Sequence, residues 1–256
     1  MIKICVSDVD GTLLPAGLDE IPEKTIKALS DLKQSGVKLA IASGRSHYSL
    51  EKLFSKVSEG TYFICNDGSV CVKDGKVLYT KPISATDVFR IIREDKYSSC
   101  GIMLCCPKCA YVIKGGEEFA GNLRGLHNDD VRIASNIYDI QEPVCKIAVF
   151  SKESKVTPVA GLPAMLRVSY NDNGWCEYVS AISDKGLALS DLQMRLYLSK
   201  YDTACIGDGV NDLEMMKKAK YPISAGDAAS ELAAVCTYHT DDVERTLLEI
   251  ADGTFH

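Results

Sequence analysis

No apolar run in this 256-residue sequence approaches the roughly 20 residues that a helix needs to cross a bilayer. The first residues also lack a basic segment followed by a long apolar core, so they do not resemble a secretory signal. Low-complexity tracts and internal repeats are missing too, which argues against disordered and fibrous classes. We therefore expect a globular, cytoplasmic protein with no membrane partner.

An excess of basic residues is likewise missing, since the net charge is -6 and the isoelectric point is near 5.3. A protein that coats nucleic acid needs a basic face to neutralise phosphates, so we expect no nucleic acid partner. Small anionic ligands remain open if positive groups gather locally. The length allows one sizeable core and a second, smaller unit, and we expect a monomer or a weak homodimer.

The sequence contains 11 cysteines, but it has little of the repeated CxxC spacing that is typical of metal sites. Their odd number and their spread from Cys5 to Cys236 indicate reduced thiols that pack as small hydrophobic side chains. The one cluster, CCPKC at Cys105, Cys106 and Cys109, has the spacing of half a zinc site, but no second CxxC or pair of histidines follows at a suitable distance. We favour a turn between two strands there, and a role for the cluster stays open.

Apolar, β-branched segments alternate with segments of helical spacing in the first part of the chain. Strands are predicted at 2–7, 37–43 and 61–66, and helices at 22–36 and 46–57. Strands that are almost continuously apolar and are separated by helices are typical of a parallel sheet covered on both faces. The predicted fold class is therefore α/β, with a doubly wound, mostly parallel sheet.

A hairpin and a change of pattern follow. The Asp74-Gly75 pair between two strand-like runs predicts a tight turn, because both central residues of such a turn adopt positive φ. The segment 83–180 mixes helices and strands in a way that suits an α+β cap domain, with helices on one face of its sheet. The α/β pattern then returns, so we predict a discontinuous core at 1–82 and 181–256 with the cap inserted between its two parts.

Polar signatures stand at the ends of three predicted core strands, with a fourth at the start of a core helix. The carboxyl ends of the strands in an open parallel sheet lie along one edge, where ligands bind. Separate stretches of sequence are thus expected to meet at one site. The four signatures are Asp8-Val9-Asp10-Gly11-Thr12, Ser43-Gly44-Arg45, Ser183-Asp184-Lys185-Gly186 and Gly207-Asp208-Gly209-Val210-Asn211-Asp212.

Four residues of these signatures are acids that would repel one another unless a cation lay among them. Oxygen ligands without histidine or cysteine select a hard cation, and few carboxylates with room for water and substrate oxygens favour Mg²⁺ over Ca²⁺. The sequence therefore predicts Mg²⁺ as the cofactor. The four acids are Asp8, Asp10, Asp208 and Asp212.

Three further features indicate a phosphate. Ser43 offers a hydroxyl, Gly44 an unshielded backbone N–H, and Lys185 a compact positive charge that pairs with phosphoryl oxygens. The GxxxxGK[ST] signature of a nucleotide-binding loop is absent. Each of the four polar signatures alone has an ordinary structural explanation, such as a turn or a solvated lysine. Their joint occurrence at strand ends favours a phosphate-binding site. A phosphate beside Mg²⁺ and an aspartate is set for attack by that carboxylate.

The motifs DVDGTLL, IASGR, SDKGLAL and GDGVNDLEM, in this order, resemble those of the haloacid dehalogenase superfamily of phosphatases, specifically its Cof-type branch with a class IIB cap. The cap segment VCKIAVF is similar as well. The resemblance spans essentially the whole chain, with the strong matches in the core. It implies a haloacid dehalogenase-like core with an inserted cap that closes over it.

For the acids, the resemblance implies that Asp8 is the nucleophile that forms an aspartyl-phosphate. Asp10 would protonate the leaving oxygen and then activate water against the phosphoenzyme. The Asp8 carboxylate and the Asp10 main-chain carbonyl would hold Mg²⁺ together with Asp208, and Asp212 would act directly or through water.

For the phosphate, the resemblance implies that Ser43, the Gly44 amide and Lys185 hold the phosphoryl oxygens. Lys185 counts as catalytic because it offsets the charge that builds as carboxylate approaches phosphate. Asn211 would steady its loop or touch the phosphate, and Arg45 is expected among the phosphate-binding residues.

One departure from the family pattern lies beside this site. After the third strand the family usually shows Asn-Gly-Ala, whereas this chain has Asn66-Asp67-Gly68-Ser69. Asp67 either faces away from the site or contacts a substrate hydroxyl, and the sequence leaves this open.

We therefore expect a Mg²⁺-dependent phosphatase that hydrolyses a small phosphorylated metabolite, with a sugar phosphate favoured, through an aspartyl-phosphate. A phosphomutase on the same core is the alternative. A non-catalytic phosphate-binding regulator is a weaker one, because Asp8 and Asp10 are intact. Trp175 is expected to pack at a strand edge. The basic cap residues that either bind a polar substrate or are solvated are Lys114, Arg124, His127, Lys146 and Arg167.

Overall fold

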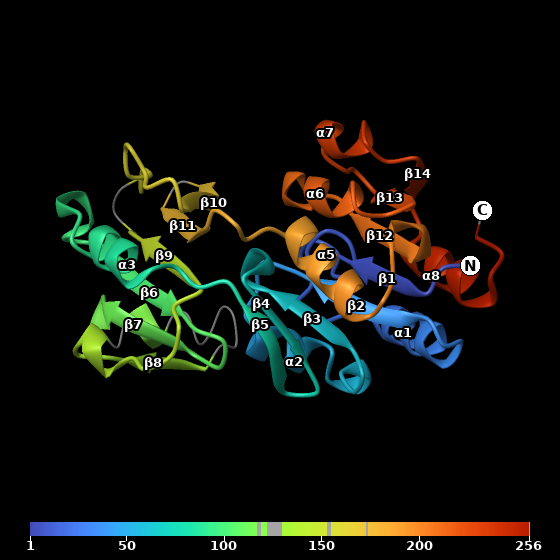
Figure 1. Cartoon of the computed structure of the whole chain (residues 1–256), viewed down its shortest axis with the longest axis horizontal. Helices are drawn as coiled ribbons and strands as arrows, with labels where there is room; N and C mark the ends of the chain where they lie inside the picture. Colours follow the sequence, from blue (N-terminus) through green and yellow to red (C-terminus); the bar gives the residue numbers. More distant parts are fainter. Residues whose placement is uncertain (117–118, 122–129, 153–154, 173, 256) are drawn as a thin grey trace.

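The computed structural model describes residues 1–116, 119–121, 130–152, 155–172 and 174–255. These residues form two sheets in two lobes, which lie beside each other along the long axis of the molecule (Figure 1). The chain passes to the second sheet after β5 (Lys76–Thr80) and returns to the first after β11 (Trp175–Ser180), so the second lobe is an insertion. Within the ranges given above, no helix is long and apolar enough to span a membrane.

The first sheet belongs to the core lobe. Its strands are β1 (Ile4–Ser7), β2 (Lys38–Ala42), β3 (Tyr62–Cys65), β4 (Val70–Lys73), β5, β12 (Thr203–Gly207), β13 (Tyr221–Ala225) and β14 (Tyr238–Thr240). Their order is β14-β13-β12-β1-β2-β3-β4-β5, parallel from β14 to β3 and antiparallel beyond. Ser7 of β1 lies opposite Ile206 and Ile41. The ends of β12, β1 and β2 therefore share one edge, where residues 208, 8 and 43 follow.

Helices cover both faces of this sheet. They are α1 (Glu23–Gln34), α2 (His47–Leu53), α5 (Lys185–Arg195), α6 (Leu213–Met216), α7 (Ser230–Ala233) and α8 (Val243–Asp252). Cys5 of β1 belongs to the apolar cluster formed with α1 and α8, whereas Ile4 and Val6 belong to the cluster formed with α5, α6 and α7. Burial of both faces explains why these strands are almost continuously apolar.

The predicted elements of the core are largely confirmed. Asp74 and Gly75 adopt φ of 48° and 70° in the hairpin turn between β4 and β5. One helix is shorter than expected, because 46–57 splits into α2 and a 3-10 turn. The short helix α6 covers four residues after another such turn. The 3-10 turns are Ser55–Val57, Asn66–Gly68, Asp95–Tyr97, Ile137–Asp139, Lys200–Asp202 and Val210–Asp212.

The second sheet forms the cap lobe. Its strands are β6 (Gly101–Cys105), β7 (Ala110–Lys114), β8 (Val131–Ile133), β9 (Lys146–Phe150), β10 (Leu166–Asp172) and β11, and the helix α3 (Ala85–Ile92) precedes them. The order is β10-β11-β9-β6-β7-β8, with antiparallel neighbours except for the parallel pair β7–β8. A mostly parallel core sheet with a mixed cap sheet confirms the expected fold class. The domain boundaries at 82 and 180 stay a prediction.

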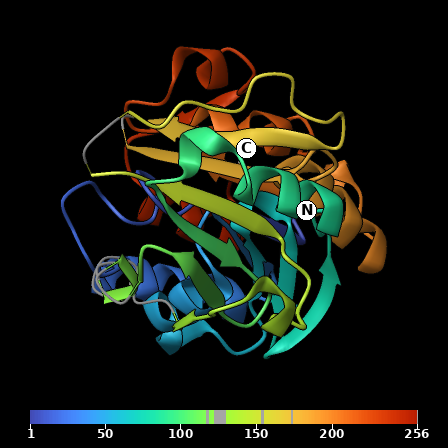
Figure 2. The ribbon, with the colours of Figure 1, turned by 90° about the vertical axis from the view of Figure 1, so that its left-hand side faces the viewer.

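Side chains alternate between the two faces of the cap sheet, as the pleat of a strand requires. Ile147 and Val149 of β9 belong to one apolar cluster with Val88 and Ile91 of α3. This helix lies on the face turned away from the core lobe (Figure 2). Lys146, next to Ile147 in the strand, is on the opposite face, which looks toward the core lobe.

The CCPKC segment forms the turn between β6 and β7, as favoured from the sequence. The Cys106 N–H donates to the Cys109 carbonyl oxygen at 2.9 Å. All the cysteines are free thiols, and they are buried except for the partly exposed Cys236. They therefore act as small apolar side chains, as expected.

The cap core depends on a hydroxyl pair that can be tested. Tyr178 contacts the Tyr97 hydroxyl at 2.5 Å and accepts the Val159 N–H at 2.9 Å. We expect Tyr178→Phe to lower the free energy of unfolding by about 1–3 kcal/mol, because a buried N–H loses its acceptor. Urea unfolding followed by circular dichroism measures this, with Tyr138→Phe as the exposed control. Equal midpoints for the two variants would contradict the prediction.

Candidate active site

Asp8 follows β1 and is buried against a lysine from a distant part of the chain. Lys185, the first residue of α5, donates through Nζ to Asp8 Oδ1 at 2.5 Å and to Asp212 Oδ1 at 2.6 Å. Lys185 and Asp212 are buried as well. Three of the four polar motifs therefore meet at the predicted edge of the sheet, through two ion pairs.

The charges in this group depend on one another. Burial acts to lower the pKa of Lys185, but the Asp212 and Asp8 carboxylates outweigh burial and hold that pKa above its usual range. The lysine is therefore an ammonium. Burial raises the pKa of Asp8 to about 7, while Lys185 acts to lower it and Asp212 to raise it. One lysine thus supplies less positive charge than these carboxylates require.

Asp208, at the end of β12, completes a group of acids that fits a divalent cation. One carboxylate oxygen from each of Asp8, Asp208 and Asp212 lies within 4.8 Å of the other two, and no other such group occurs in the part of the chain that the structure describes. Three carboxylates beside the Lys185 ammonium leave two negative charges uncompensated. Oxygen donors alone suit a hard cation. The Asp10 side chain lies outside this group, and a metal contact through its main-chain carbonyl stays a prediction.

The turn after β1 shapes this metal site. The Thr12 hydroxyl donates to Asp208 Oδ1 at 2.5 Å. Burial raises the pKa of Asp208, and the bond from Thr12 acts to lower it. Gly11 has a φ of +89° and packs so closely on Asp208 that a Cβ there would overlap the carboxylate. The turn therefore requires glycine for both its conformation and its lack of a side chain.

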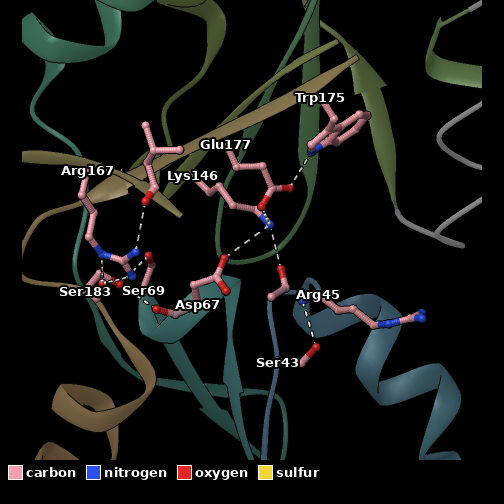
Figure 3. Close-up of polar contacts among 11 residues, drawn as sticks. Ser43, Arg45, Asp67, Ser69, Lys146, Arg167, Trp175, Glu177 and Ser183 are labelled. Carbon is pink, nitrogen blue, oxygen red and sulfur yellow. Dashed lines mark hydrogen bonds and ion pairs between the residues drawn. The ribbon is translucent and has the colours of Figure 1, made fainter. Parts of the chain in front are cut away.

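The loop after β2 is held from both lobes. Ser43 is buried, and its Oγ accepts the Arg45 N–H at 3.2 Å. Lys146 of the cap donates to the Gly44 carbonyl oxygen at 2.7 Å (Figure 3). Both polar groups of the Gly44–Arg45 peptide are thus engaged. Because the Ser43 oxygen accepts a bond, its hydroxyl proton can be donated to a ligand.

Asp10 is paired with Arg45. The guanidinium donates through Nε to Asp10 Oδ2 at 2.9 Å and through Nη2 to Asp10 Oδ1 at 2.6 Å. The Asp10 side chain is 53% exposed, and exposed ion pairs contribute only about 0–1 kcal/mol. This pair therefore contributes little to the stability of the fold. A phosphate contact for Arg45 stays a prediction.

The last two residues of the GDGVND turn, Asn211 and Asp212, differ in burial and in their contacts. Asp212 is buried, and its Oδ2 accepts the Gly209 N–H at 3.1 Å while Oδ1 pairs with Lys185. Asn211 is exposed and lines the same cavity as Asp8. A phosphate contact for Asn211 stays a prediction.

A cavity of about 730 Å³ lies between core and cap residues and brings the predicted site together. Its core wall includes Asp8, Asp10, Ser43, Gly44, Arg45 and Asn211. Lys185 and Asp212 contact Asp8 from outside this wall. A buried carboxylate at a cavity wall, with an ammonium behind it and a hydroxyl beside it, can attack a phosphate ester.

The sequence profile of the haloacid dehalogenase-like hydrolases matches residues 5–246. This chain belongs to that family. The expected enzyme class, a phosphatase of the haloacid dehalogenase family, is confirmed, and the hypothesis of a non-catalytic regulator is set aside. The second sheet agrees with the expected class IIB cap of a Cof-type member.

Similar proteins align over nearly the whole chain. The 5-amino-6-(5-phospho-D-ribitylamino)uracil phosphatase YbjI of Escherichia coli (strain K12) is 21% identical, over 98% of this chain and 95% of its own. The HMP-PP phosphatase of Yersinia pseudotuberculosis serotype O:1b (strain IP 31758) is 25% identical, over 91% and 86%. The crystal structure of a haloacid dehalogenase-like hydrolase from Bacteroides thetaiotaomicron has a TM-score of 0.83 and 22% identity, over 98% and 100%. This last likeness supports the fold.

The sequence did not reveal the contacts among the cap residues that line the cavity, here called the cap wall. Lys146 is buried, donates to Glu177 Oε2 at 3.0 Å and lies 4.0 Å from Asp67 Oδ2. Trp175, expected only to pack at a strand edge, also lines the cavity and donates to Glu177 Oε1 at 3.0 Å (Figure 3). Asp67 lines the cavity too, so the hypothesis that it faces away is wrong. A lysine within the apolar run VCKIAVF was the available signal, because a buried charge needs partners.

Lys114 and Arg167, the other basic cap candidates among the described residues, do not line this cavity. Lys114 donates to the carbonyl oxygen at the end of α3 at 2.8 Å. Arg167 donates to the Ser183 carbonyl oxygen at 2.9 and 2.5 Å, between the lobes. Arg124 and His127 lie outside the described residues.

The close packing of Gly11 on Asp208 gives a test of the metal site. We expect Gly11→Ala to displace the Asp208 carboxylate and to raise the divalent metal concentration for half-maximal phosphatase activity by about 10–100-fold. Gly17→Ala is the matched control, because Gly17 has a φ of +84° and a Cβ there would have nothing within 4 Å. It should lower stability by about 1 kcal/mol through backbone strain and leave the metal requirement unchanged. Equal metal requirements in both variants would contradict this role for Gly11.

Proposed function

We propose that this protein hydrolyses the phosphate monoester of a small metabolite, with a sugar phosphate as the favoured substrate, through an aspartyl-phosphate on Asp8. The main support is the contact between Asp8 and Lys185 beside two further acids, at the wall of a cavity with room for a small metabolite. Both relatives described above are named as phosphatases, one of them of a phosphorylated ribitylamino-uracil.

Attack on phosphorus is assigned to Asp8. Lys185 holds Asp8 Oδ1, which leaves Oδ2 to form the bond to phosphorus as the bond to the leaving oxygen breaks. Ser43, the Gly44 N–H and Lys185 would bind the phosphoryl oxygens and offset the charge that develops there. The Lys185 ammonium cannot leave without exposing buried carboxylates, so it is already in place for this step.

Proton transfer is assigned to Asp10. It protonates the leaving oxygen, then takes a proton from the water that attacks the aspartyl-phosphate, which releases inorganic phosphate and restores Asp8. The two bonds from Arg45 hold the Asp10 carboxylate at the cavity wall. The exposure of this pair allows water to reach it.

The metal ligands would be the Asp8, Asp208 and Asp212 carboxylates and the Asp10 main-chain carbonyl, with Mg²⁺ as the cation. When bound, the cation supplies positive charge that stabilises the phosphoryl oxygens beside Asp8. Hydrolysis of phosphate monoesters needs acceleration by up to about 10²¹-fold. Lys185 alone cannot provide this, so positioning, charge and proton transfer must act together.

Replacement of the nucleophile tests the proposal directly. Asp8→Asn keeps the size of the side chain and removes the attacking carboxylate. We expect inorganic phosphate release from a panel of sugar phosphates with Mg²⁺ to fall by at least about 10³-fold. Chelation of the metal should abolish release in the wild type, and added Mg²⁺ should restore it.

The control for this test is Asp19→Asn, which makes the same change at an exposed position and should keep full activity. Undiminished release by Asp8→Asn would refute the nucleophile. Isomerised sugar phosphate without release of inorganic phosphate would point to a phosphomutase instead.

The role of Asp10 is tested with two kinds of leaving group. In Asp10→Asn, transfer from p-nitrophenyl phosphate to Asp8 should persist, because nitrophenolate leaves without a proton. Hydrolysis of the aspartyl-phosphate should slow by about 10²–10⁴-fold, since its general base is missing. We expect a burst of nitrophenolate close to one equivalent per enzyme, measured by stopped flow. A wild-type steady rate without a burst would rule out this assignment.

A further inference from the structure

The cavity extends beyond the groups that would hold a phosphate. Its volume of about 730 Å³ falls within the range of sites for small organic ligands. Its cap wall includes Lys146 on β9 and Trp175 and Glu177 on β11. The leaving group, which is the part of the substrate other than phosphate, would therefore lie against these residues.

Lys146 is the centre of this wall and is held by three groups (Figure 3). Its Nζ donates to Glu177 Oε2 at 3.0 Å and to the Gly44 carbonyl oxygen at 2.7 Å, and it lies 4.0 Å from Asp67 Oδ2. The side chain is only 7% exposed. If it turned away, the buried Asp67 and the half-buried Glu177 would lose their cation. Lys146 is thus committed to acceptors of the protein itself.

The charges of the cap wall do not cancel. Burial acts to lower the pKa of Lys146, but the Glu177 and Asp67 carboxylates outweigh burial and hold that pKa above its usual value. One ammonium therefore faces two carboxylates. Arg45 is the other cation that lines the cavity among the described residues, and it is paired with Asp10. Counted over the described residues, the wall around Lys146 is left with one excess negative charge.

Glu177 has a further hydrogen bond, and Asp67 packs closely against Gly44. The Trp175 indole N–H donates to Glu177 Oε1 at 3.0 Å. Asp67 lies over Gly44, so that a Cβ on Gly44 would stand 3.1 Å from Asp67 Oδ1. Carboxylate oxygens have several lone pairs each, so they can accept bonds from a ligand in addition to these contacts. The wall therefore offers two carboxylate acceptors to a ligand in the cavity.

We propose that Asp67, Lys146 and Glu177 form a specificity subsite that accepts uncharged or cationic leaving groups with hydroxyl or amino donors and rejects phosphate esters with a second anionic group. This inference rests on the proposed phosphatase function. Hydroxyl and ammonium groups can donate to the two carboxylates. A carboxylate or second phosphate on the substrate would meet like charges, and the cations that line the cavity among the described residues are already paired, which discriminates against it.

Substrate pairs that differ by one anionic group test the subsite. Glycerol phosphate is compared with phosphoglycerate, and glucose phosphate with phosphogluconate, since a carboxylate replaces an uncharged group in each pair. We expect kcat/KM with Mg²⁺ to be at least about tenfold higher for the uncharged member. If the esters of a pair are hydrolysed too slowly to measure, each is tested as an inhibitor of p-nitrophenyl phosphate hydrolysis, and the two inhibition constants are compared.

Two variants assign the effect to the subsite. Glu177→Gln and Asp67→Asn each remove one negative charge and keep the size and an accepting oxygen of the side chain. Each should reduce the preference for the uncharged member by about tenfold. Asp139→Asn makes the same charge change on the exposed surface of the cap and should leave the preference unchanged.

The outcomes separate the subsite from the proposed function. Equal kcat/KM or equal inhibition for both members of each pair, or an unchanged preference in both Glu177→Gln and Asp67→Asn, overturns the subsite. Hydrolysis of p-nitrophenyl phosphate that depends on Asp8 leaves the proposed function standing in that case. If no ester releases phosphate, the aryl phosphate included, the proposed function fails and the subsite proposal falls with it.

Discussion

A buried ammonium between two carboxylates is the interaction on which the rest of the site depends. Removing one partner from such a pair costs about 3–5 kcal/mol, because the remaining charge has no water around it. Lys185 and Asp8 are 177 residues apart in the sequence and 2.5 Å apart in the fold. The adjacency of β12 and β1, with α5 packed on the same sheet, brings them together with Asp212. The topology of the sheet is therefore also the assembly of the site.

The cap lobe also contains a buried lysine that is paired with carboxylates, Lys146. Because side chains alternate along β9, Ile147 packs into the apolar cluster with α3 while Lys146 faces the cavity. One strand thus contributes to the core of the cap and to the wall of the site. The bond from Lys146 to the Gly44 carbonyl crosses between the lobes. The loop that is proposed to hold phosphate is consequently shaped in part by the cap.

Local signals explain why much of the core was predictable. The strands before Asp8 and Ser43 are apolar and end in polar motifs, and both signals lie within a few neighbouring residues. β14 escaped prediction because its three residues, Tyr-His-Thr, show no apolar alternation. The pairing of Arg45 with Asp10, and that of Lys146 with Glu177, escaped as well. Such pairings depend on strand order and register, which the periodicity of one sequence does not determine.

Asp67, the departure from the family pattern, lies where both lobes meet. Its N–H donates to the Ser43 carbonyl oxygen at 3.2 Å, and its own carbonyl oxygen accepts the Ser183 hydroxyl at 3.2 Å. Its φ of 54° costs a residue with a side chain about 1–3 kcal/mol, which these contacts offset. The carboxylate that this turn presents is only partly neutralised, since Lys146 is shared with Glu177. This turn of the core therefore adds a negative charge to the cavity wall that faces the cap.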